Sequence, residues 1–463
     1  MSDIKEACGV IGIYNNDNWN LPKDLYYGLF ALQHRGQESC GMAVSNKGVV
    51  KHHKDMGLVN EVFSSDMIDS MQGNIGIGHC RYSTTGNSEK ANAQPLVMQS
   101  VSGTLSIAHN GNLVDSVELK QKLMKEQGAI FHTAIDSEIM AYLIAKEGVH
   151  YPHLEDSVRR ATEQVNGSFA LLVMCPTKLV GMRDPLGIKP LCLGMKGKSY
   201  ILASESCAID AIGGTFVRDI DPGELVVIDK DGLRSFPKKE EKRAPRPCIF
   251  EYIYFARPDS IMDGQSIYLS RQMAGRILAQ RYPVDADVVI AVPDSGIDAA
   301  IGYSQESGIP YGVGLIKNRY IGRTFIQPVQ VQREEAVRIK LNALKHTVDG
   351  KRVVLVDDSM VRGTTSASII KMLKKAGAKE VHMRISAPTF VWPCFYGIDL
   401  PEKKQLTACN HTIEEIRQLL DADSLGFFKI EDLVRILPDC RFQTYCDACF
   451  SGDYPTPVTV KED

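Results

Sequence analysis

Two adjacent carboxylates and a run of glycine and hydroxyl residues form the most informative polar group in the sequence. In RVVLVDDSMVRGTTSAS, residues 352–368, an apolar run ends at Asp357 and Asp358, and a glycine–hydroxyl segment then opens a helical pattern. Ligands bind beyond the carboxyl ends of strands in open α/β sheets, and the free N–H groups at a helix start hold phosphate. The acids suit ribose hydroxyls, or a Mg²⁺ ion that is itself bound to pyrophosphate. The alternative that both acids merely cap a helix does not explain why strand, acids, glycine and hydroxyls occur in this order.

This segment resembles the phosphoribosyl pyrophosphate signature of the type I phosphoribosyltransferases. The resemblance implies that Asp357 and Asp358 hold ribose hydroxyls and Mg²⁺, and that the residues after them bind the 5-phosphate: Arg362, Gly363, Thr364, Thr365 and Ser366. Upstream, AVPDSGIDAAIGY follows a second apolar run and resembles the family's pyrophosphate loop, which is formed here by Pro293, Asp294, Ser295 and Gly296. By the same resemblance Ser295 contacts the metal.

A basic, glycine-containing segment lies between these two motifs. IKNRYIGRTFIQP, residues 316–328, contains Lys317, Arg319 and Arg323 beside Gly322. Cations next to a mobile glycine suit a flap that closes over a polyphosphate and excludes water. An ordinary basic surface loop remains the alternative interpretation.

Near the amino terminus, Cys8 precedes the apolar run GVIGIY. A lone cysteine before a strand is usually structural, but other segments supply the remaining parts for attack on an amide. The parts are a cation to bind a carboxylate, a side-chain amide and a glycine N–H to hold an oxyanion, and an acid to bind an amine. The segments that contain them are LQHRGQESCGM (His34, Arg35, Gly36), GHCRYSTTG (Arg81), AHNGNL (Asn110, Gly111) and TAIDSE (Asp136).

This set resembles the class II glutamine amidotransferases, which use an amino-terminal nucleophile. The resemblance implies that Cys8 attacks the carboxamide of glutamine, that Asn110 and Gly111 form the oxyanion hole, and that Arg81 and Asp136 bind the α-carboxylate and α-amine. An α-amine with a pKa of about 7.7 to 8.0 can accept the thiol proton, whereas a peptide nitrogen cannot. Residues 1–7, MSDIKEA, are therefore predicted to be a propeptide that is removed.

Cys446 and Cys449 form a CxxC motif, whose spacing alone is compatible with zinc, redox or iron–sulfur chemistry. A zinc site would usually show a second CxxC or a paired His, and Cys440 is the only nearby candidate. A redox pair is expected at a strand–helix junction rather than in a terminal tail. Three segments, those around the CxxC motif, around Cys248 and around Cys394, resemble the ligand-carrying segments of one branch of the amidotransferases. Members of that branch carry a [4Fe-4S] cluster and are made with a short propeptide. That resemblance implies one cluster per subunit, held by Cys248, Cys394, Cys446 and Cys449.

The elements that must position these groups change character along the chain. Up to about Gly232, many short strand patterns with few helices predict stacked antiparallel sheets covered by helices, as in an α+β (αββα) amino-terminal-nucleophile domain. Later, near-continuous apolar runs alternate with helical ones, which predicts an α/β domain with a parallel sheet that includes residues 310–317. A linker is expected at 234–247, with a surface hairpin as the alternative. The predicted organisation is a propeptide, a glutaminase domain, a phosphoribosyltransferase domain and a helical, Cys-containing tail: 1–7, 8–235, 248–400 and 401–463.

Composition excludes several classes of protein. The 463 residues include 53 Lys and Arg against 56 Asp and Glu, a net charge of -3, so no overall basic field attracts nucleic acid. Neither a secretory signal nor an apolar run long enough to span a membrane is present, so a cytoplasmic location is expected. Thiols stay reduced in that compartment, and the seven cysteines other than Cys8 and the four proposed ligands are expected in the core or have no assigned role.

Taken together, the two halves resemble the family of glutamine amidotransferases that act on phosphoribosyl pyrophosphate. The resemblance implies a transfer of ammonia from glutamine to C1 of that sugar, at the committing step of purine synthesis. It also implies one Mg²⁺ per subunit, inhibition by purine nucleotides, and a homodimer or homotetramer. Other class II amidotransferases lack the VVLVDDSMVRGTTS segment, and a regulatory binding protein would carry a DNA-binding element and an altered acid pair.

Overall fold

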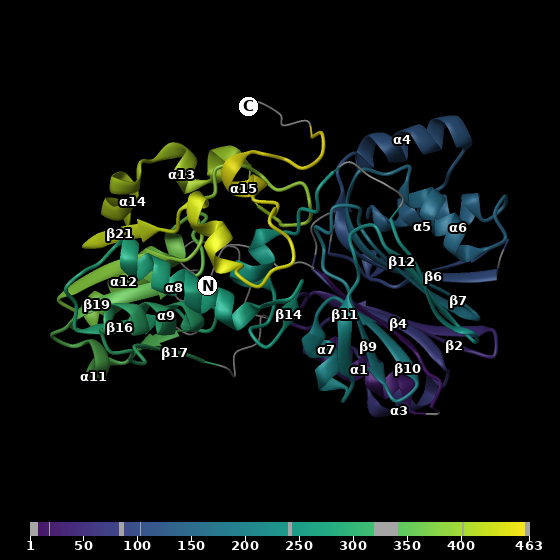
Figure 1. Cartoon of the computed structure of the whole chain (residues 1–463), viewed down its shortest axis with the longest axis horizontal. Coiled ribbons are helices and arrows are strands. Elements are labelled where there is room, and N and C mark those ends of the chain that lie inside the picture. The colour runs from purple at the N-terminus through teal and green to yellow at the C-terminus, as the bar shows by residue number, and fades with distance from the viewer. Residues whose placement is uncertain are drawn as a thin grey trace.

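The protein consists of two domains that lie side by side in the computed structural model (Figure 1). The structure describes residues 8–17, 19–82, 88–101, 103–238, 243–318, 341–400 and 402–458. The expected propeptide and three residues of the expected flap, Arg319, Gly322 and Arg323, lie outside the described residues. No helix in the described part of the chain is both long and apolar enough to cross a membrane.

Two antiparallel sheets form the N-terminal domain, and their facing sides enclose an apolar core that includes Val10, Ile77, Leu172 and Val226. The first sheet has seven strands in the order β11 (Thr215–Asp219), β9 (Cys192–Lys196), β10 (Ser199–Ala203), β1 (Gly9–Tyr14), β4 (Ile75–Arg81), β2 (Ser39–Asn46) and β3 (Val49–Met56). The second has six, in the order β13 (Gly232–Phe236), β12 (Leu225–Asp229), β8 (Lys178–Arg183), β7 (Gly167–Cys175), β6 (Gly103–Leu113) and β5 (Leu96–Ser100).

Helices cover the outer face of each sheet. The first sheet packs against α1 (Leu21–Ala31), α2 (Val59–Val62), α3 (Ser65–Ser70) and α7 (Ser206–Ala211), and the second against α4 (Ser116–Gln127), α5 (Ser137–Glu147) and α6 (Leu154–Thr162) (Figure 1). Helix, sheet, sheet and helix therefore stack in four layers. This confirms the expected αββα architecture.

The second domain is built on a four-stranded parallel sheet in the order β16 (Val288–Ala291), β19 (Arg352–Asp357), β20 (Glu380–Ile385) and β21 (Ser424–Phe427). The longer helices beside it are α8 (Ile267–Arg281), α9 (Ile297–Ser307), α12 (Thr364–Lys375) and α14 (Ile413–Leu420). Its strands are almost entirely buried, as expected for a sheet covered on both faces. The predicted α/β class is confirmed.

Shorter elements connect the two domains and the tail. A π-helical turn (Glu251–Phe255) and the hairpin β14 (Ile261–Met262) and β15 (Gln265–Ser266) follow the domain connection, and α11 (Lys345–Val348) precedes β19. The C-terminal segment contains α13 (Thr407–Asn410), a 3-10 helix (Ile430–Ile436) and α15 (Ala448–Ser451). In Figure 1 the yellow end of this segment, which includes α15, runs over the second domain near its boundary with the first.

The expectation that residues 310–317 form a strand of the parallel sheet is wrong. Only Tyr311 forms an isolated parallel bridge, to Val289, and β17 (Leu315–Lys317) instead pairs antiparallel with β18 (Leu341–Ala343). The physical reason is the pair of glycines in this run, because glycine weakens a strand interior and lets backbones approach closely. A Cβ on Gly314 would lie 2.6 Å from the Ile290 side chain.

Two segments differ in extent from the expected domain limits. β13 continues to Phe236 and so occupies the beginning of the stretch expected to be a linker. β21 comes from beyond residue 400 and pairs with β20 through His382 and Ser424, so the C-terminal segment completes the parallel sheet. The tail is thus part of the second domain's core as well as a cover over it.

Candidate active sites

The first candidate site is built around Cys8, immediately before the central strand β1. The side chain is buried, and its Sγ donates to the carbonyl oxygen of Tyr82 at 3.4 Å. Tyr82 follows β4, the neighbour of β1, and Gly9 lies opposite Cys80 in that pairing. The register therefore brings Arg81, the last residue of β4, next to the nucleophile.

The facing sheet supplies the other half of this site. His79 on β4 contacts the carbonyl oxygen of His109 on β6 through Nε2 at 3.0 Å, which joins the two sheets where Arg81 and Asn110 follow. Asn110 is buried, and its Nδ2 has no hydrogen-bond partner among the described residues. Gly111 has φ +145°, and a Cβ there would lie 2.0 Å from the carbonyl oxygen of Ser168. An unused amide donor beside a glycine N–H suits a developing oxyanion.

Asp136 lies at the start of α5 and is anchored to β6. Its Oδ2 accepts from the backbone N–H of Leu113 at 2.8 Å. Burial raises the pKa of the Cys8 thiol, the Tyr82 contact, Arg81 and Lys189 lower it, and Asp136 raises it. The structure thus brings Cys8, Arg81, Asn110, Gly111 and Asp136 together, as the sequence analysis expected.

The second candidate site lies at the carboxyl end of the parallel sheet. Asp357 ends β19, and both Asp357 and Asp358 are buried. Burial, followed by the charge of Asp358, raises the pKa of Asp357 to about 8. Two buried acids held side by side in this way suit a cation or hydroxyl donors.

The expected pyrophosphate loop lies against this acidic pair. Ser295 Oγ and Ser359 Oγ each donate to a different carboxylate oxygen of Asp358. Gly296 approaches β19 so closely that a Cβ would lie 2.5 Å from the carbonyl oxygen of Val356. Lys317, at the end of β17, forms an ion pair with Asp294 at 2.8 Å. The two motifs, 63 residues apart at Ser295 and Asp358, therefore meet as expected.

The expected 5-phosphate segment turns into α12. Gly363 has φ +73°, a left-handed conformation that favours glycine, and it directly precedes the first helical residue, Thr364. Ser366 is buried, whereas Arg362 is exposed and donates to Gln405 Oε1 at 2.7 Å. The N–H groups of Thr364, Thr365 and Ser366 in this first turn are available for an anion.

Four cysteines expected as cluster ligands come together from three segments. Cys248 forms a parallel bridge with Cys446, and the Ile249 N–H donates to the Cys446 carbonyl at 3.1 Å. The N–H groups of Val391 and Trp392, just before Cys394, both donate to the Cys449 carbonyl at 3.2 Å. All 12 cysteines, each of which the structure describes, are free.

Their thiols form an electrostatically coupled group in an apolar surrounding. Burial raises the pKa of Cys449 well above its ordinary value, and Cys394, Cys248 and Cys446 raise it further. Within the described ranges, no three His, Cys, Asp or Glu side chains lie close enough together to hold a single metal ion. The four thiols are nevertheless close enough for Cys248, Cys394 and Cys446 to shift the pKa of Cys449.

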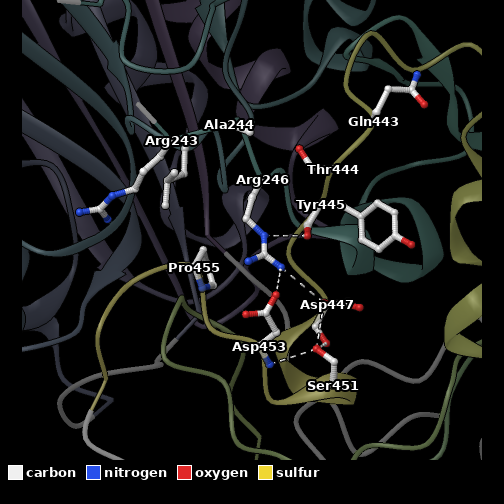
Figure 2. Close-up of a pocket in the computed structure, with 11 residues that line it drawn as sticks. Arg243, Ala244, Arg246, Gln443, Thr444, Tyr445, Asp447, Ser451, Asp453 and Pro455 are labelled. Atoms are coloured by element: carbon white, nitrogen blue, oxygen red, sulfur yellow. Dashed lines mark hydrogen bonds and ion pairs between the residues drawn. The ribbon is translucent and has the colours of Figure 1, made fainter. Parts of the chain in front are cut away.

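The tail that carries Cys446 and Cys449 is held to the domain connection by Arg246. Figure 2 shows the Arg246 side chain extending from the domain connection toward the tail. It donates to the Tyr445 carbonyl at 3.1 Å and to the Asp453 carboxylate at 2.7 Å, and its guanidinium lies 3.8 Å from the Asp447 carboxylate. These residues line a hollow of about 630 Å³ beside the cysteines. These contacts of Arg246 hold the tail next to Cys248.

Buried ion pairs join the two domains, and one set is formed by Arg35, a residue that the sequence predicted to be part of the glutaminase site. Arg35, whose Nε donates to the Cys8 carbonyl at 3.0 Å, forms ion pairs with Glu205 at 2.5 Å and with Glu251 at 2.6 Å. Arg183 on β8 pairs with Asp263 of the β14–β15 hairpin at 2.8 Å. No sequence motif identifies the acids Glu205, Glu251 and Asp263, because each is far from its arginine in the sequence. The separations are 170 residues for Arg35–Glu205, 216 for Arg35–Glu251 and 80 for Arg183–Asp263.

The segment after Cys394 contacts the oxyanion-hole strand directly. Asn112 Nδ2 donates to the Phe395 carbonyl at 2.9 Å, and Ser168 Oγ donates to the Tyr396 carbonyl at 2.9 Å. Gly397 has φ +96°, and a Cβ there would lie 3.5 Å from the backbone of Gly111. The cysteine group and the glutaminase site are therefore in contact through one short segment.

Comparisons with known proteins agree with this division into two sites. The glutamine amidotransferase domain family matches residues 79–211, and the phosphoribosyl transferase domain family matches residues 259–387. The amidophosphoribosyltransferase of Archaeoglobus fulgidus is 50% identical over 98% of this chain and 99% of its own length. That of Bacillus subtilis is 46% identical, over 98% and 95%.

Solved structures show the same likeness. The glutamine phosphoribosylpyrophosphate amidotransferase of Bacillus subtilis, complexed with ADP and GMP, is 46% identical over 98% of each chain, with a TM-score of 0.90. A structure described as the allosteric regulatory enzyme of purine biosynthesis, also 46% identical, covers 98% of this chain and 97% of its own, with a TM-score of 0.91.

Proposed function

The chain belongs to the amidophosphoribosyltransferase family, and we propose that Cys8 and the pair Asp357–Asp358 divide its reaction between two sites. The reaction transfers the amide nitrogen of glutamine to C1 of phosphoribosyl pyrophosphate. It gives 5-phosphoribosylamine, glutamate and pyrophosphate, and it is the first committed step of de novo purine (IMP) biosynthesis. Glutamine and phosphoribosyl pyrophosphate are its substrates.

In the glutamine half, the Cys8 thiolate attacks the carboxamide carbon and forms a glutamyl thioester, with release of ammonia; water then releases glutamate. Asn110 Nδ2 and the Gly111 N–H donate to the oxyanion, while Arg81 and Asp136 hold the α-carboxylate and α-amine. The position of the unused Asn110 donor supports this assignment.

The proton of the Cys8 thiol needs a base, and we assign that role to the α-amine of Cys8 itself. Removal of residues 1–7 creates this amine, whose ordinary pKa lies close to neutrality. The mass of the active protein is then expected to start at Cys8. Active enzyme that still carries Met1–Ala7 would refute this part of the proposal.

In the second half, ammonia attacks C1 of the ribose and pyrophosphate leaves. The residues from Arg362 to Ser366 hold the 5-phosphate, the 293–296 loop orients the pyrophosphate, and Lys317 and Arg319 supply positive charge to it. Ser295, Asp357 and Asp358 would hold one Mg²⁺, which when bound neutralises charge on the leaving group. The donor set fits this ion, because two adjacent buried carboxylates and the Ser295 hydroxyl, which contacts Asp358, are oxygen ligands of the kind that Mg²⁺ prefers.

We also assign one [4Fe-4S] cluster to Cys248, Cys394, Cys446 and Cys449. The donor set supports this, since four thiols that influence one another electrostatically, three of them buried and that of Cys394 half-buried, suit an iron–sulfur group. The cluster, when bound, would tie the domain connection, the second domain and the tail together.

Three further proposals concern regulation, assembly and location. The relative from Bacillus subtilis is complexed with ADP and GMP, so we propose purine nucleotides as feedback inhibitors here. We propose a homodimer or homotetramer as the working form. We place the enzyme in the cytoplasm, where its free thiols stay reduced.

The observation that carries the division of labour is the enclosure of Cys8 by β4 and β6 in one domain and of Asp357–Asp358 by β16 and β19 in the other. Replacing the nucleophile, Cys8→Ser, is expected to abolish product formation from glutamine and to leave formation from ammonia intact. Cys175→Ser, at a half-buried cysteine outside both sites, is the matched control and keeps both activities. Asp358→Asn is expected to lose both, and loss of both in Cys8→Ser would contradict the proposal.

A further inference from the structure

Lys189 is a fully buried lysine whose charged end has no partner. The residue follows β8 and is 0% exposed, and its Nζ has no hydrogen-bond partner among the described residues. Its backbone is fixed on both sides: the N–H donates to Asp184 Oδ2 at 3.0 Å, and the carbonyl accepts from Arg183 Nε at 2.8 Å. The main chain around Lys189 is therefore fixed, and its ammonium is enclosed by the protein.

An ammonium in such a place requires a compensating anion, because burial of an unpaired charge is costly. The nearest acids of its own loop do not supply one. Asp184 accepts from the N–H groups of Leu186, Ile188 and Lys189, all at 3.0 Å. Glu251 is held by Arg35, and no ion pair joins Lys189 to any acid in the described part of the chain.

Two segments that carry proposed cluster ligands approach Lys189. The Cys248 N–H donates to the carbonyl of Ile188, next to Lys189, at 3.3 Å. Gly397, three residues after Cys394, faces the ammonium so closely that a Cβ would lie 3.2 Å from Nζ.

We propose that Lys189 is the cationic partner of the iron–sulfur group, donating an N–H to a cluster or cysteine sulfur and offsetting the charge of the four thiolates. This inference rests on the proposed [4Fe-4S] cluster. Net charge and hydrogen bonds to sulfur set the reduction potential of such clusters. A nearby positive charge favours the reduced cluster, so Lys189 raises the potential and slows oxidative loss of iron.

The test uses the full-length enzyme, purified without oxygen, and the variants Lys189→Met and Lys189→Arg. Iron and acid-labile sulfide per chain, the midpoint potential, and the half-life of the visible absorbance in air are measured on each. Lys189→Met is expected to lower the potential by about 59 mV or more, equivalent to a tenfold change for a one-electron couple. It is also expected to bleach several-fold faster in air, and Lys189→Arg restores both values toward those of the parent.

Lys178→Met is the matched control, since Lys178 lies at the other end of β8 and pairs with Glu155. A folded Lys189→Met chain without iron, beside an iron-containing Lys189→Arg chain, also supports the proposal. An unchanged potential and lifetime in Lys189→Met would overturn it. So would iron loss in both Lys189 variants, which would indicate a requirement for shape rather than charge. An iron-free parent enzyme would instead refute the cluster itself, and this inference with it.

Discussion

Asn110 shows how much of the glutaminase chemistry depends on one side chain. Its Nδ2 is buried without an acceptor in the described structure, so it has a donor to give to a developing oxyanion. We expect Asn110→Ala to lower kcat with glutamine by about 10²- to 10³-fold, the usual cost of losing one such donor, with little change in KM. Steady-state rates with glutamine and with ammonia measure this.

The ammonia-dependent rate is the internal control, because the second site is untouched. Asn166→Ala is the matched variant, since Asn166 also uses its side-chain amide, but toward the exposed carbonyl of Pro457 at 3.1 Å. Equal losses with glutamine and ammonia would contradict the assignment.

His79 makes the N-terminal domain sensitive to acid. Burial lowers its pKa from 6.5 to about 3, so the folded state resists a proton that the unfolded chain accepts. Stability is therefore greatest above pH 6.5 and is lost as the pH falls from there toward 3, by about 2 kcal/mol at pH 5. His79→Gln is expected to lose less stability than the parent between pH 7 and pH 5 in urea unfolding. Parallel losses in both proteins would show that His79 is not responsible.

Sequence reasoning found the residues whose chemistry is visible in their type and order. Cys8, Asn110 and Asp357 stand in recognisable segments, and the fold brings each to its expected neighbours. The roles of Lys189 and Glu251 could not be predicted, because the sequence does not distinguish a buried lysine or glutamate from a solvent-exposed one. Only the approach of distant segments reveals that their charges are enclosed.

Among the elements, the segment after Cys394 forms direct hydrogen bonds with strands β6 and β7 of the other domain. Ser168 on β7 donates to the buried carbonyl of Tyr396, which joins this segment to the strand next to the oxyanion hole. We expect Ser168→Ala to lower the free energy of unfolding by about 1 to 3 kcal/mol, because it leaves a buried acceptor unpaired. Chemical unfolding followed by tryptophan fluorescence and circular dichroism measures this.

Ser100→Ala is the control for that variant. Ser100 Oγ also donates to a carbonyl, that of Gly103 at 2.8 Å, but within an edge hairpin rather than between domains. Equal effects of the two substitutions would mean that the contact with Tyr396 has no special weight.

Strands were easier to predict than their pairing. Apolar periodicity identified β1, β6, β16 and β19, because burial on one or both faces leaves a clear pattern. It could not show that residues 315–317 leave the parallel sheet, since local apolarity does not reveal which strand is adjacent. Nor could it show that Ser424–Phe427 joins that sheet from the tail.

At the scale of the whole molecule, Arg35 joins the two domains at the nucleophile. It is buried, binds the Cys8 carbonyl, and pairs with Glu205 of the first domain and Glu251 beyond the connection. Arg35→Met removes one charge and leaves two buried carboxylates, so we expect a loss of about 3 to 5 kcal/mol in stability. Arg160→Met, which breaks an exposed pair with Glu163 and a contact of the guanidinium with the Tyr151 ring, is expected to change stability by less than about 1 kcal/mol. A similar small loss in Arg35→Met, measured by urea unfolding, would show that the pair is dispensable.

The two-domain organisation itself followed from the change of pattern near residue 240. What sequence could not give is the interface, because it consists of single residues from many elements rather than of one motif. Arg183 and Asp263 illustrate this, since each is unremarkable until the fold buries both.

The Arg183–Asp263 pair also constrains how such a chain can change over generations. Each partner is 0–1% exposed, and each lies in a different domain. Loss of Asp263 leaves the enclosed guanidinium of Arg183 without its acid, and loss of Arg183 leaves Asp263 with Arg441 as its remaining partner. If recombination replaced only the first domain by one from a distant lineage, the new domain could lack the residue that pairs with Asp263. The two domains are therefore expected to be inherited together, with compensating substitutions at these two positions.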